Sequence, residues 1–301
     1  MSAIAAIDIG TNTTLLLVAT VDGNGVRVLD EQAEITRLGR GIGTGGELQA
    51  ENIERTLDAL RRFADIARRH GARIVAVGTE GLRRAANANR FIEPAEQILG
   101  TSVSVIPGDR EAELVFTATT RSFPDEARGA MTVIDIGGGS TEFILANAGT
   151  VGFRRSLPLG SVRLHEQFLH DDPPTAAQCA ALETHVAKTL VDIPFAPGAT
   201  LIGTAGTVTT LSAMALSLAT YDPAVVHGHR LSVTALDDQI LRLQRATLHD
   251  RKNMVGLDPK RADVVLAGGL LLRSIARAAR VEAITVSDRG VRWGLLFAAG
   301  D

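Results

Sequence analysis

The sequence predicts an α/β protein of two domains, and three observations support this. The chain has 301 residues, more than a single domain usually contains. Short apolar strands alternate with segments of helical periodicity. A glycine-rich stretch near residue 8 recurs near residue 135, and a repeat at this spacing suggests two related domains. We expect domains at 1–125 and 126–301, with the last helix packing back on the first domain.

The second copy of the repeat reads D-I-G-G-G-S-T-E from Asp135 to Glu142, with apolar runs on both sides. This pattern predicts two strands joined by a tight turn. Glycines let the backbone approach a ligand closely, and successive N–H groups in such a turn form a nest for phosphate. Asp135 and Glu142 flank the nest and can hold a divalent cation against the phosphate. An ordinary glycine hairpin with two solvated carboxylates is the alternative. The predicted phosphate-binding residues of this turn are Gly137, Gly138, Gly139, Ser140 and Thr141.

The first copy reads D-I-G-T-N-T from Asp8 to Thr13 and aligns with the second position by position. Asp8 corresponds to Asp135 and Gly10 to Gly137. We therefore expect each domain to contribute one phosphate hairpin to a shared cleft. The predicted phosphate-binding residues of the first copy are Gly10, Thr11, Asn12 and Thr13.

The remaining elements follow from periodicity and from glycine or proline breaks. Further strands are expected at 26–29, 74–77, 103–106, 153–157 and 284–286. Helices are expected at 53–70, from 109 onward, at 162–168, 176–191 and 291–299, and at 261–279 with a break at Gly268-Gly269. Glu111 falls in the first turn of its helix, where a carboxylate is electrostatically favoured.

A third glycine loop connects a strand to a helix after Leu201. Helix N-termini approached through glycines are ready phosphate sites, although a tight packing turn has a similar sequence. The candidate binding residues of this loop are Gly203, Thr204, Gly206 and Thr207.

Composition restricts the possible partners. The net charge of −3 argues against a broad nucleic-acid-binding face. The 28 arginines against 3 lysines indicate a GC-rich genome, although arginine forks in particular loops would suit phosphate. The single cysteine, Cys179, gives neither a disulfide nor a metal cluster and fits a reducing cytoplasm. We expect no signal peptide, and we expect the uncharged stretch 196–221 to be buried core because its glycines and threonines are too polar for lipid.

Taken together, these stretches resemble the exopolyphosphatase and guanosine pentaphosphate phosphohydrolase family, within the actin, sugar-kinase and heat-shock ATPase superfamily. The resemblance covers nearly the whole chain and implies two actin-like (ribonuclease H-like) domains with an interdomain active-site cleft. Besides the two hairpins, the motifs that carry it are R-L-G from Arg37, T-E-G-L-R from Thr79 with Asn87, G-D-R-E-A from Gly108, L-G-S-V-R-L from Leu159, G-T-A-G-T from Gly203, His227-Gly228, R-A-D from Arg261 and A-G-G from Ala267.

The resemblance implies that Glu111 is the general base that activates the attacking water. Asp135 and Glu142 would position Mg²⁺, or Mn²⁺, with Asp8 assisting, and Arg83 would hold phosphate together with the glycine turns. Further candidate binding residues are Arg37, Asn87 and His227.

Two departures from the family pattern are visible. Glu80-Gly81 replaces a small Ser-Ala pair and puts an acid near the Arg83 loop. Trp293 stands where the family has Glu. We also expect no counterpart of the additional C-terminal helical domain of larger members.

We therefore expect an exopolyphosphatase that removes the terminal phosphate of inorganic polyphosphate. It should prefer short chains and act with little processivity, because net charge −3 offers few contacts to a long polyanion. The alternatives are a guanosine pentaphosphate phosphohydrolase, a sugar-kinase-like phosphotransferase or ATPase, and a non-catalytic sensor of these ligands. A cytoplasmic homodimer that binds neither nucleic acid nor membrane is the expected form.

Overall fold

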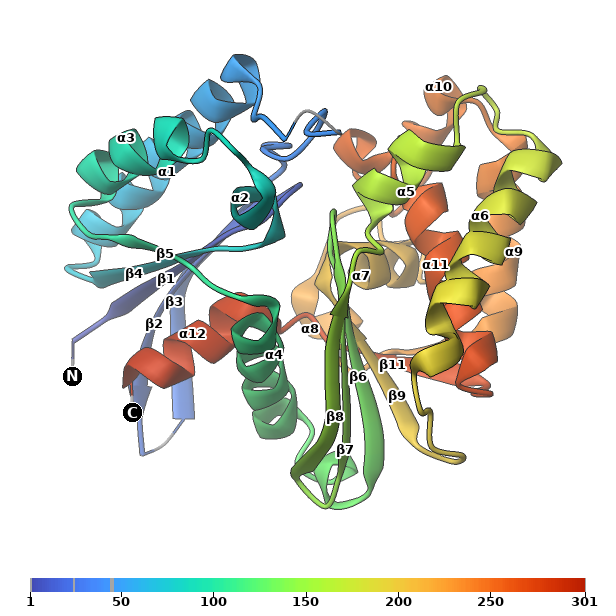
Figure 1. Cartoon of the computed structure of the whole chain (residues 1–301). Helices are drawn as coiled ribbons and strands as arrows, with labels where there is room; N and C mark the ends of the chain where they lie inside the picture. The colour runs from blue at the N-terminus through green and yellow to red at the C-terminus, as the bar shows by residue number, and fades with distance from the viewer. Residues whose placement is uncertain (1, 24, 44–45, 301) are drawn as a thin grey trace. The chain divides into compact units, whose positions relative to one another are not determined.

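The computed structural model describes residues 2–23, 25–43 and 46–300, which fold into two α/β units with one sheet each (Figure 1). The first unit comprises Met1–Ala118 and Gly290–Asp301, and the second comprises Thr119–Arg289. The division between the two units lies inside helix α4 (Gly108–Ser122). The C-terminal helix α12 (Val291–Gly300) packs on strands β1 and β2 of the first unit.

The first sheet has the strand order β3-β2-β1-β4-β5. Strands β1, β4 and β5 run parallel, whereas β2 is antiparallel to β1 and β3 to β2. The carboxyl ends of the three parallel strands therefore meet at one edge of the sheet. The elements of this unit, besides α4 and α12, are β1 (Ile4–Ile9), β2 (Thr14–Asp22), β3 (Gly25–Glu34), α1 (Ala50–Arg69), β4 (Arg73–Gly78), α2 (Glu80–Arg84), α3 (Asn89–Leu99) and β5 (Val103–Val105).

Both faces of the first sheet are covered, as the fully buried strand β1 requires. Ile7 and Ile9 share a core with α1 and α3, whereas Ile4 and Ala6 share one with α12. Trp293 lies in the second of these cores and contributes to the apolar contact between α12 and the sheet. Because side chains alternate along a strand, Asp8 points to the α12 side.

The second sheet has the strand order β10-β11-β9-β6-β7-β8. Strands β6, β9 and β11 run parallel, and β6, β7 and β8 form an antiparallel meander. The strands are β6 (Ala130–Ile136), β7 (Thr141–Asn147), β8 (Thr150–Leu157), β9 (Thr200–Thr204), β10 (Arg230–Ser232) and β11 (Ala283–Val286). The helices are α5 (Ser161–Phe168), α6 (Ala176–Thr189), α7 (Ala205–Ala215), α8 (Pro223–Val226), α9 (Val233–Arg245), α10 (Leu248–Arg251) and α11 (Val265–Ala278).

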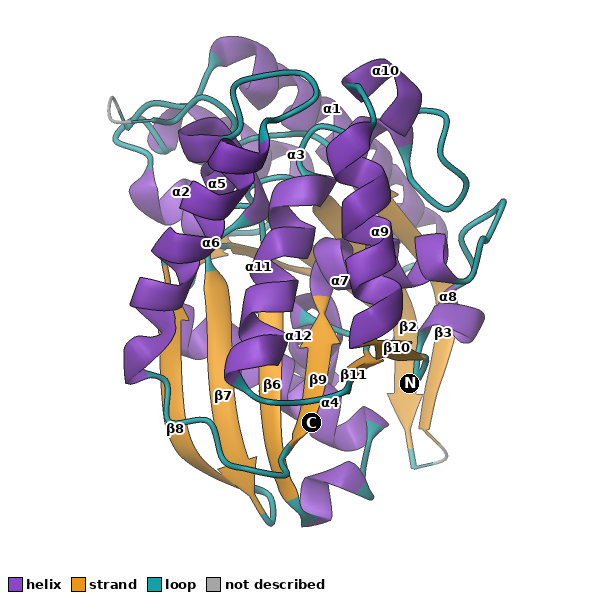
Figure 2. Ribbon diagram, turned by 90° about the vertical axis from the view of Figure 1, so that its right-hand side faces the viewer, coloured by secondary structure: helices purple, strands orange, loops and turns teal. Residues whose placement is uncertain are grey.

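Helices of the second unit cover one face of its sheet; α6, α9 and α11 lie in front of the strands in Figure 2. Ile134 and Ile136 of β6 and Phe143 of β7 pack into the core beneath these helices. Alternation along each strand then places Asp135 and Glu142 on the opposite face. The sheet therefore separates the helical core from the predicted cation ligands.

The predicted break at Gly268-Gly269 is wrong: α11 is continuous through both glycines. Their lack of a side chain serves close packing. A Cβ on Gly268 would lie 2.5 Å from Thr207 Cγ2, and one on Gly269 would lie 3.2 Å from Ile240 Cγ1. The sequence pattern suggested a break because glycine usually weakens a helix, but here tight helix packing overrides that preference.

The uncharged stretch 196–221 forms β9 and α7 and contributes to the core, as expected. Among the described residues, no helix combines the length and the apolar character that crossing a membrane requires.

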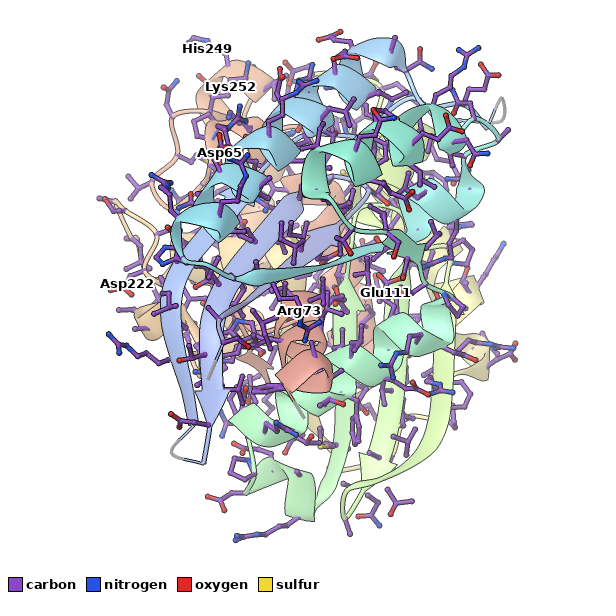
Figure 3. The ribbon with its side chains drawn as sticks, turned by 90° about the vertical axis from the view of Figure 1, so that its left-hand side faces the viewer. Asp65, Arg73, Glu111, Asp222, His249 and Lys252 are labelled. Atoms are coloured by element: carbon purple, nitrogen blue, oxygen red, sulfur yellow. The ribbon has the colours of Figure 1, made fainter. Side chains whose placement is uncertain are left out.

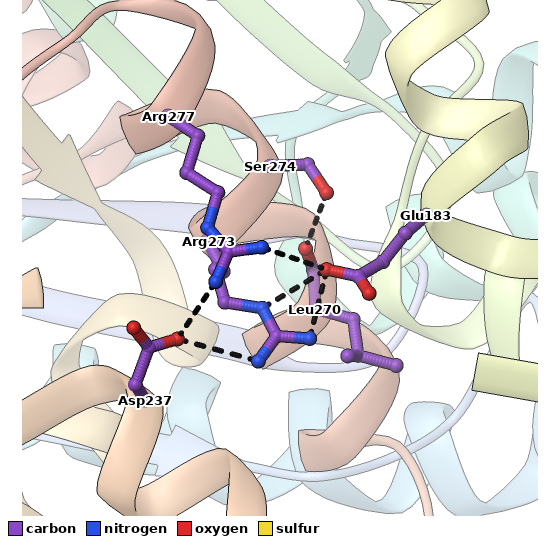
Figure 4. A network of polar contacts seen from close by, with 6 residues as sticks. All are labelled: Glu183, Asp237, Leu270, Arg273, Ser274 and Arg277. Atoms are coloured by element: carbon purple, nitrogen blue, oxygen red, sulfur yellow. Dashed lines mark hydrogen bonds and ion pairs between the residues drawn. The ribbon is translucent and has the colours of Figure 1, made fainter. Parts of the chain in front are cut away.

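Helices α6, α9 and α11 are joined by an ion-pair network (Figure 4). Arg273 Nε donates to Glu183 Oε1 at 2.9 Å, and Arg273 Nη1 donates to Asp237 Oδ1 at 3.3 Å. Arg277 contacts the same two carboxylates at 3.9 and 3.4 Å. The Arg273 side chain is 10% exposed and that of Arg277 57%, so Arg273 is the interior member of the network.

We expect Arg273→Met to destabilise the second unit by about 2 kcal/mol, between the values for exposed and fully buried pairs. The substitution keeps the apolar stem but leaves Glu183 and Asp237 with one exposed partner. Arg277→Met is the matched control and should cost less than about 1 kcal/mol. Urea denaturation followed by circular dichroism measures both; equal effects would contradict the assigned role of Arg273.

Candidate functional site

The edge where β1, β4 and β5 end gathers the polar residues of the first unit. Thr79 N donates to Ile9 O at 3.2 Å, and Ile106 N donates to Gly78 O at 3.0 Å, so the segments leaving the three strands remain adjacent. Asp8 precedes the end of β1, and α2 and α4 follow β4 and β5. The parallel arrangement of the three strands therefore brings Glu111, the predicted base, and Asp8, a predicted metal ligand, to the same edge although they are distant in sequence.

The N-terminal hairpin, whose turn is Gly10–Thr13, is closed by a bond from Gly10 N to Thr13 O at 3.1 Å. Two carbonyls of the turn accept hydrogen bonds from the segment that follows β3: Thr11 O accepts from Gly39 N at 2.8 Å, and Asn12 O accepts from Arg37 N at 2.9 Å. In a trans peptide the N–H points opposite to the C=O of the same unit. The N–H groups of Asn12 and Thr13 are therefore directed to the opposite side of the turn.

The central hairpin, whose turn is Gly137–Ser140, is held in the same way by the start of α5. Gly137 O accepts from Ser161 N at 3.0 Å, and Gly138 O accepts from Val162 N at 2.9 Å. Gly139 O accepts from Arg163 Nε at 2.9 Å. The N–H groups of the next three residues, Gly138, Gly139 and Ser140, must point to the side opposite α5. This arrangement is a backbone nest suited to an anion.

Each hairpin is backed by a glycine at van der Waals distance. A Cβ on Gly160 would lie 2.3 Å from Gly138 O, and a Cβ on Gly39 would lie 2.4 Å from Thr11 Cγ2. Any larger residue would displace the backing segment. The two copies of the repeat thus share a mode of support as well as a sequence pattern.

A row of polar residues crosses four strands of the second sheet. Glu142 pairs in register with Asp135 and with Ser156, and Asp135 pairs with Thr204. Residues paired in this way point to the same face of a sheet. Glu142 Oε1 accepts from Ser156 Oγ at 2.7 Å and from Ser140 Oγ at 2.9 Å. The row therefore places two carboxylates side by side next to the central hairpin.

Glu111 lies at the start of α4 (Figure 3). Its side chain is paired with Arg83. Arg83 Nη1 donates to Glu111 Oε2 at 2.7 Å and to Ile106 O at 2.8 Å, so the guanidinium is held by both the carboxylate and the backbone. Burial raises the pKa of Glu111, Arg83 opposes the rise, and the negative charge of Glu80 adds to it. The result is a nearly buried carboxylate with enhanced basicity and a fixed orientation.

Asp8 is 8% exposed, and its Oδ1 has no hydrogen-bond partner among the described residues. Burial and the charge of Glu111 raise the pKa of Asp8 to about 7, against the opposing charge of Arg292. A buried oxygen without a donor is costly unless a ligand completes it. Asp8 therefore fits a cation or a protonated phosphate oxygen.

The third glycine loop contains a second oxygen of this kind. Thr204 Oγ1 is buried and has no hydrogen-bond partner among the described residues. Ala205 takes a left-handed φ of 69° at the start of α7, and Arg261 covers Gly206 so closely that a Cβ there would lie 2.0 Å from Nη1. The N-terminus of α7 and the nearby guanidinium both attract negative charge, so this loop also fits phosphate. Thr207 packs against Gly268 instead.

The further candidates of the sequence analysis have structural partners. Arg37 takes a left-handed φ of 57° and supports the N-terminal hairpin through its backbone N–H. Both groups of the Asn87 amide bond to the backbone of Leu48, at 2.8 and 3.0 Å. His227 stacks on Phe123 with ring centroids 4.9 Å apart, and its Nδ1 accepts from Asp288 N at 3.3 Å. Arg37 and Asn87 thus order the loops around the site.

His227 gives a pH prediction for stability. Burial and the charge of Arg289 lower the pKa of His227 to about 4, so the folded state resists protonation that the unfolded chain accepts. The stability contributed by neutral His227 is present above about pH 6.5 and is lost as the pH falls through about 4. We expect His227→Gln to reduce the fall in melting temperature between pH 7 and pH 4. The exposed His249 provides the control: His249→Gln should retain the wild-type fall.

Two α/β units with supported glycine hairpins, a buried carboxylate paired with an arginine, and two adjacent carboxylates are typical of a phosphate-handling enzyme. The chain belongs to the Ppx/GppA phosphatase family, which matches residues 17–300. It is 33% identical to exopolyphosphatase 2 of Mycobacterium tuberculosis, covering 98% of each chain. It is 28% identical to the guanosine-5'-triphosphate,3'-diphosphate pyrophosphatase of Aeromonas salmonicida, over 97% of this chain and 58% of that protein. The solved exopolyphosphatase of Cytophaga hutchinsonii superposes with a TM-score of 0.92 at 28% identity, covering 100% and 98% of the two chains.

The two-domain α/β fold and the family membership are thus confirmed. Sequence reasoning did not assign site roles to Arg163, Ser156 or Arg261. The motifs around Leu159 and Arg261 contained two of them, but their relation to the hairpins depends on tertiary contacts. Ser156 had no sequence signal beyond its place in the strand predicted at 153–157.

Proposed function

We propose that this chain is an exopolyphosphatase that hydrolyses the terminal phosphoanhydride bond of inorganic polyphosphate with the help of a divalent cation. One observation carries the proposal: in both hairpins the carbonyls of the turn accept hydrogen bonds from a neighbouring segment. Because these carbonyls all point toward that segment, the N–H groups of the turn point to the opposite side, where they can bind a ligand. Such N–H groups can bind phosphate oxygens without preference for a base or sugar. The full-length similarity to a relative named exopolyphosphatase supports the same substrate.

In the proposed reaction, water attacks the terminal phosphorus and the bond to the bridging oxygen breaks. The electron pair goes to the shortened polyphosphate, and a proton of the water goes to the Glu111 carboxylate. A base with a raised pKa accepts this proton more readily than an exposed glutamate does. Arg83 orients that carboxylate through its hydrogen bond. Its positive charge can also neutralise charge on the phosphate, and phosphoryl transfer depends chiefly on such positioning and charge neutralisation.

The residues present fit a hard divalent cation, Mg²⁺ or Mn²⁺. Asp135 and Glu142 of the second unit lie in register on adjacent strands. In the first unit, Asp8 by itself offers a buried oxygen without a partner among the described residues. Within the described ranges no three carboxylates, histidines or cysteines gather into a metal-ligating group. Mg²⁺ commonly binds one or two carboxylates together with substrate phosphates. The cation would neutralise the charge that develops on the phosphate oxygens.

The decisive experiment is phosphate release from polyphosphates of defined length, from guanosine pentaphosphate and from ATP, with Mg²⁺ and with a chelator. We expect release from short polyphosphate in the presence of Mg²⁺, and gradual shortening of long chains on gels. Preferred release from guanosine pentaphosphate would assign the activity of the Aeromonas relative instead. Turnover of ATP alone, or binding without release, would favour the kinase-like and sensor alternatives. The homodimer and the cytoplasmic location stay predictions from the sequence.

A further inference from the structure

The Glu80 side chain lies directly against the N-terminal hairpin. It is 7% exposed and begins α2, at the edge where β4 ends. Its Oε2 accepts from Thr11 Oγ1 at 3.1 Å, and its Oε1 accepts from Arg84 Nη1 at 3.3 Å. The carboxylate thus joins the turn residue Thr11 to the helix that also carries Arg83.

The Thr11 side chain is fixed on three sides. A Cβ on Gly81 would lie 3.2 Å from both Thr11 Cα and Oγ1, and a Cβ on Gly39 would lie 2.4 Å from Thr11 Cγ2. A side chain at position 39 would therefore displace Thr11, and one at position 81 would crowd it. Glu80-Gly81 therefore acts as a pair: the glycine admits Thr11 and the acid holds its hydroxyl.

This arrangement changes what the N-terminal hairpin presents to a ligand. A hydroxyl that donates its proton to Glu80 presents its lone pairs elsewhere, and lone pairs suit a cation or a protonated oxygen better than a bare phosphate oxygen. The Glu80 charge lies one hydroxyl away from the turn and repels bare phosphate. The same charge acts on Glu111, whose pKa it helps to raise.

We propose that Glu80 is a positioning residue that fixes the Thr11 hydroxyl and makes the N-terminal hairpin favour cation-neutralised phosphate over bare phosphate. This inference rests on the proposed function, because it assumes that the hairpin binds phosphate. It assigns Glu80 a role in determining which ionic form of the substrate is bound.

The test is isothermal titration of the full chain with inorganic phosphate, with excess Mg²⁺ and with a chelator. Glu80→Gln keeps an acceptor for Thr11 and removes the charge. We expect its affinity for bare phosphate to rise about tenfold, as the removal of a nearby like charge predicts, and its Mg²⁺ dependence to shrink by the same factor. A merely structural role for Glu80 would lower the affinity in both conditions.

The matched control is Glu51→Gln, which removes the same charge from an exposed carboxylate paired with Arg55; its phosphate affinity should equal that of the wild type. If Glu80→Gln fails to fold, Glu80→Ala provides the same charge removal. Unchanged or weaker binding of bare phosphate by the folded variant overturns the inference. If the wild type binds no phosphate in either condition, the proposed function fails together with the inference. A wild type that binds phosphate, with a variant that binds it no better, overturns the inference alone.

Discussion

Glu111→Gln is expected to lower the rate of phosphate release by about 10²- to 10⁴-fold, the usual contribution of a positioned base. Glutamine keeps the shape of the side chain and can still accept from Arg83, but it cannot take the proton of the attacking water. The fold and the Michaelis constant should therefore change little, and the loss should fall on kcat. Steady-state phosphate release from short polyphosphate measures both constants.

Glu113→Gln is the matched control for this variant. Glu113 lies on the same helix, is 47% exposed in its side chain and pairs with Arg110 at 3.0 Å. Its replacement removes the same charge from α4 without touching Arg83 and should leave kcat within about twofold of the wild type. Near-wild-type turnover of Glu111→Gln would remove Glu111 from the mechanism.

Asp8→Asn is expected to change stability and activity in opposite directions. At pH 8 the wild type holds a buried, ionised carboxylate whose folded-state pKa is about 7. Replacing it by a neutral amide should stabilise the ligand-free protein at that pH by about 1 to 4 kcal/mol, since one pKa unit corresponds to about 1.4 kcal/mol. Loss of a proposed cation ligand should lower Mg²⁺-dependent turnover by about 10- to 100-fold.

The pH dependence of this gain follows from the sign of the shift. Because the folded-state pKa of Asp8 is raised, its stabilising contribution is fully present below about pH 4 and is lost as the pH rises through about 7. The advantage of Asp8→Asn should therefore shrink as the pH falls from 8 to 4. Thermal melts at several pH values measure it, with Asp65→Asn, a change of an exposed carboxylate on α1, as the control. A variant that is less stable than the wild type at pH 8 would show that Asp8 is not a destabilising charge.

The sequence alone predicted the two hairpins because their signal is local. Strand, glycine turn and strand lie within about 15 residues in each copy, and the repetition distinguishes them from a single glycine-rich turn. The two carboxylates of the central hairpin are predictable for the same reason, since in-register pairing across a tight turn places Asp135 opposite Glu142.

The remaining features depend on contacts between residues that are distant in sequence. The Arg83–Glu111 pair joins segments that follow different parallel strands. Glu80 was recognised as an unusual acid near Arg83, but its bond to Thr11 depends on how β1 and β4 pair. The continuity of α11 through Gly268-Gly269 required knowing that Thr207 and Ile240 pack there.

The positions in the sequence of the segments that bond to the two turns determine which turn can be completed first during protein synthesis. In the N-terminal hairpin, the backbone groups that hold the carbonyls of Thr11 and Asn12 belong to Gly39 and Arg37, so these two bonds can form early. Strands β6 and β7 can pair as soon as residue 147 is made, but the carbonyls of Gly137, Gly138 and Gly139 gain their partners only when residues 161–163 at the start of α5 dock. Local pairs form faster than distant ones. A nascent chain can therefore contain the complete β6–β7 hairpin before α5 fixes the turn that we propose as a phosphate site.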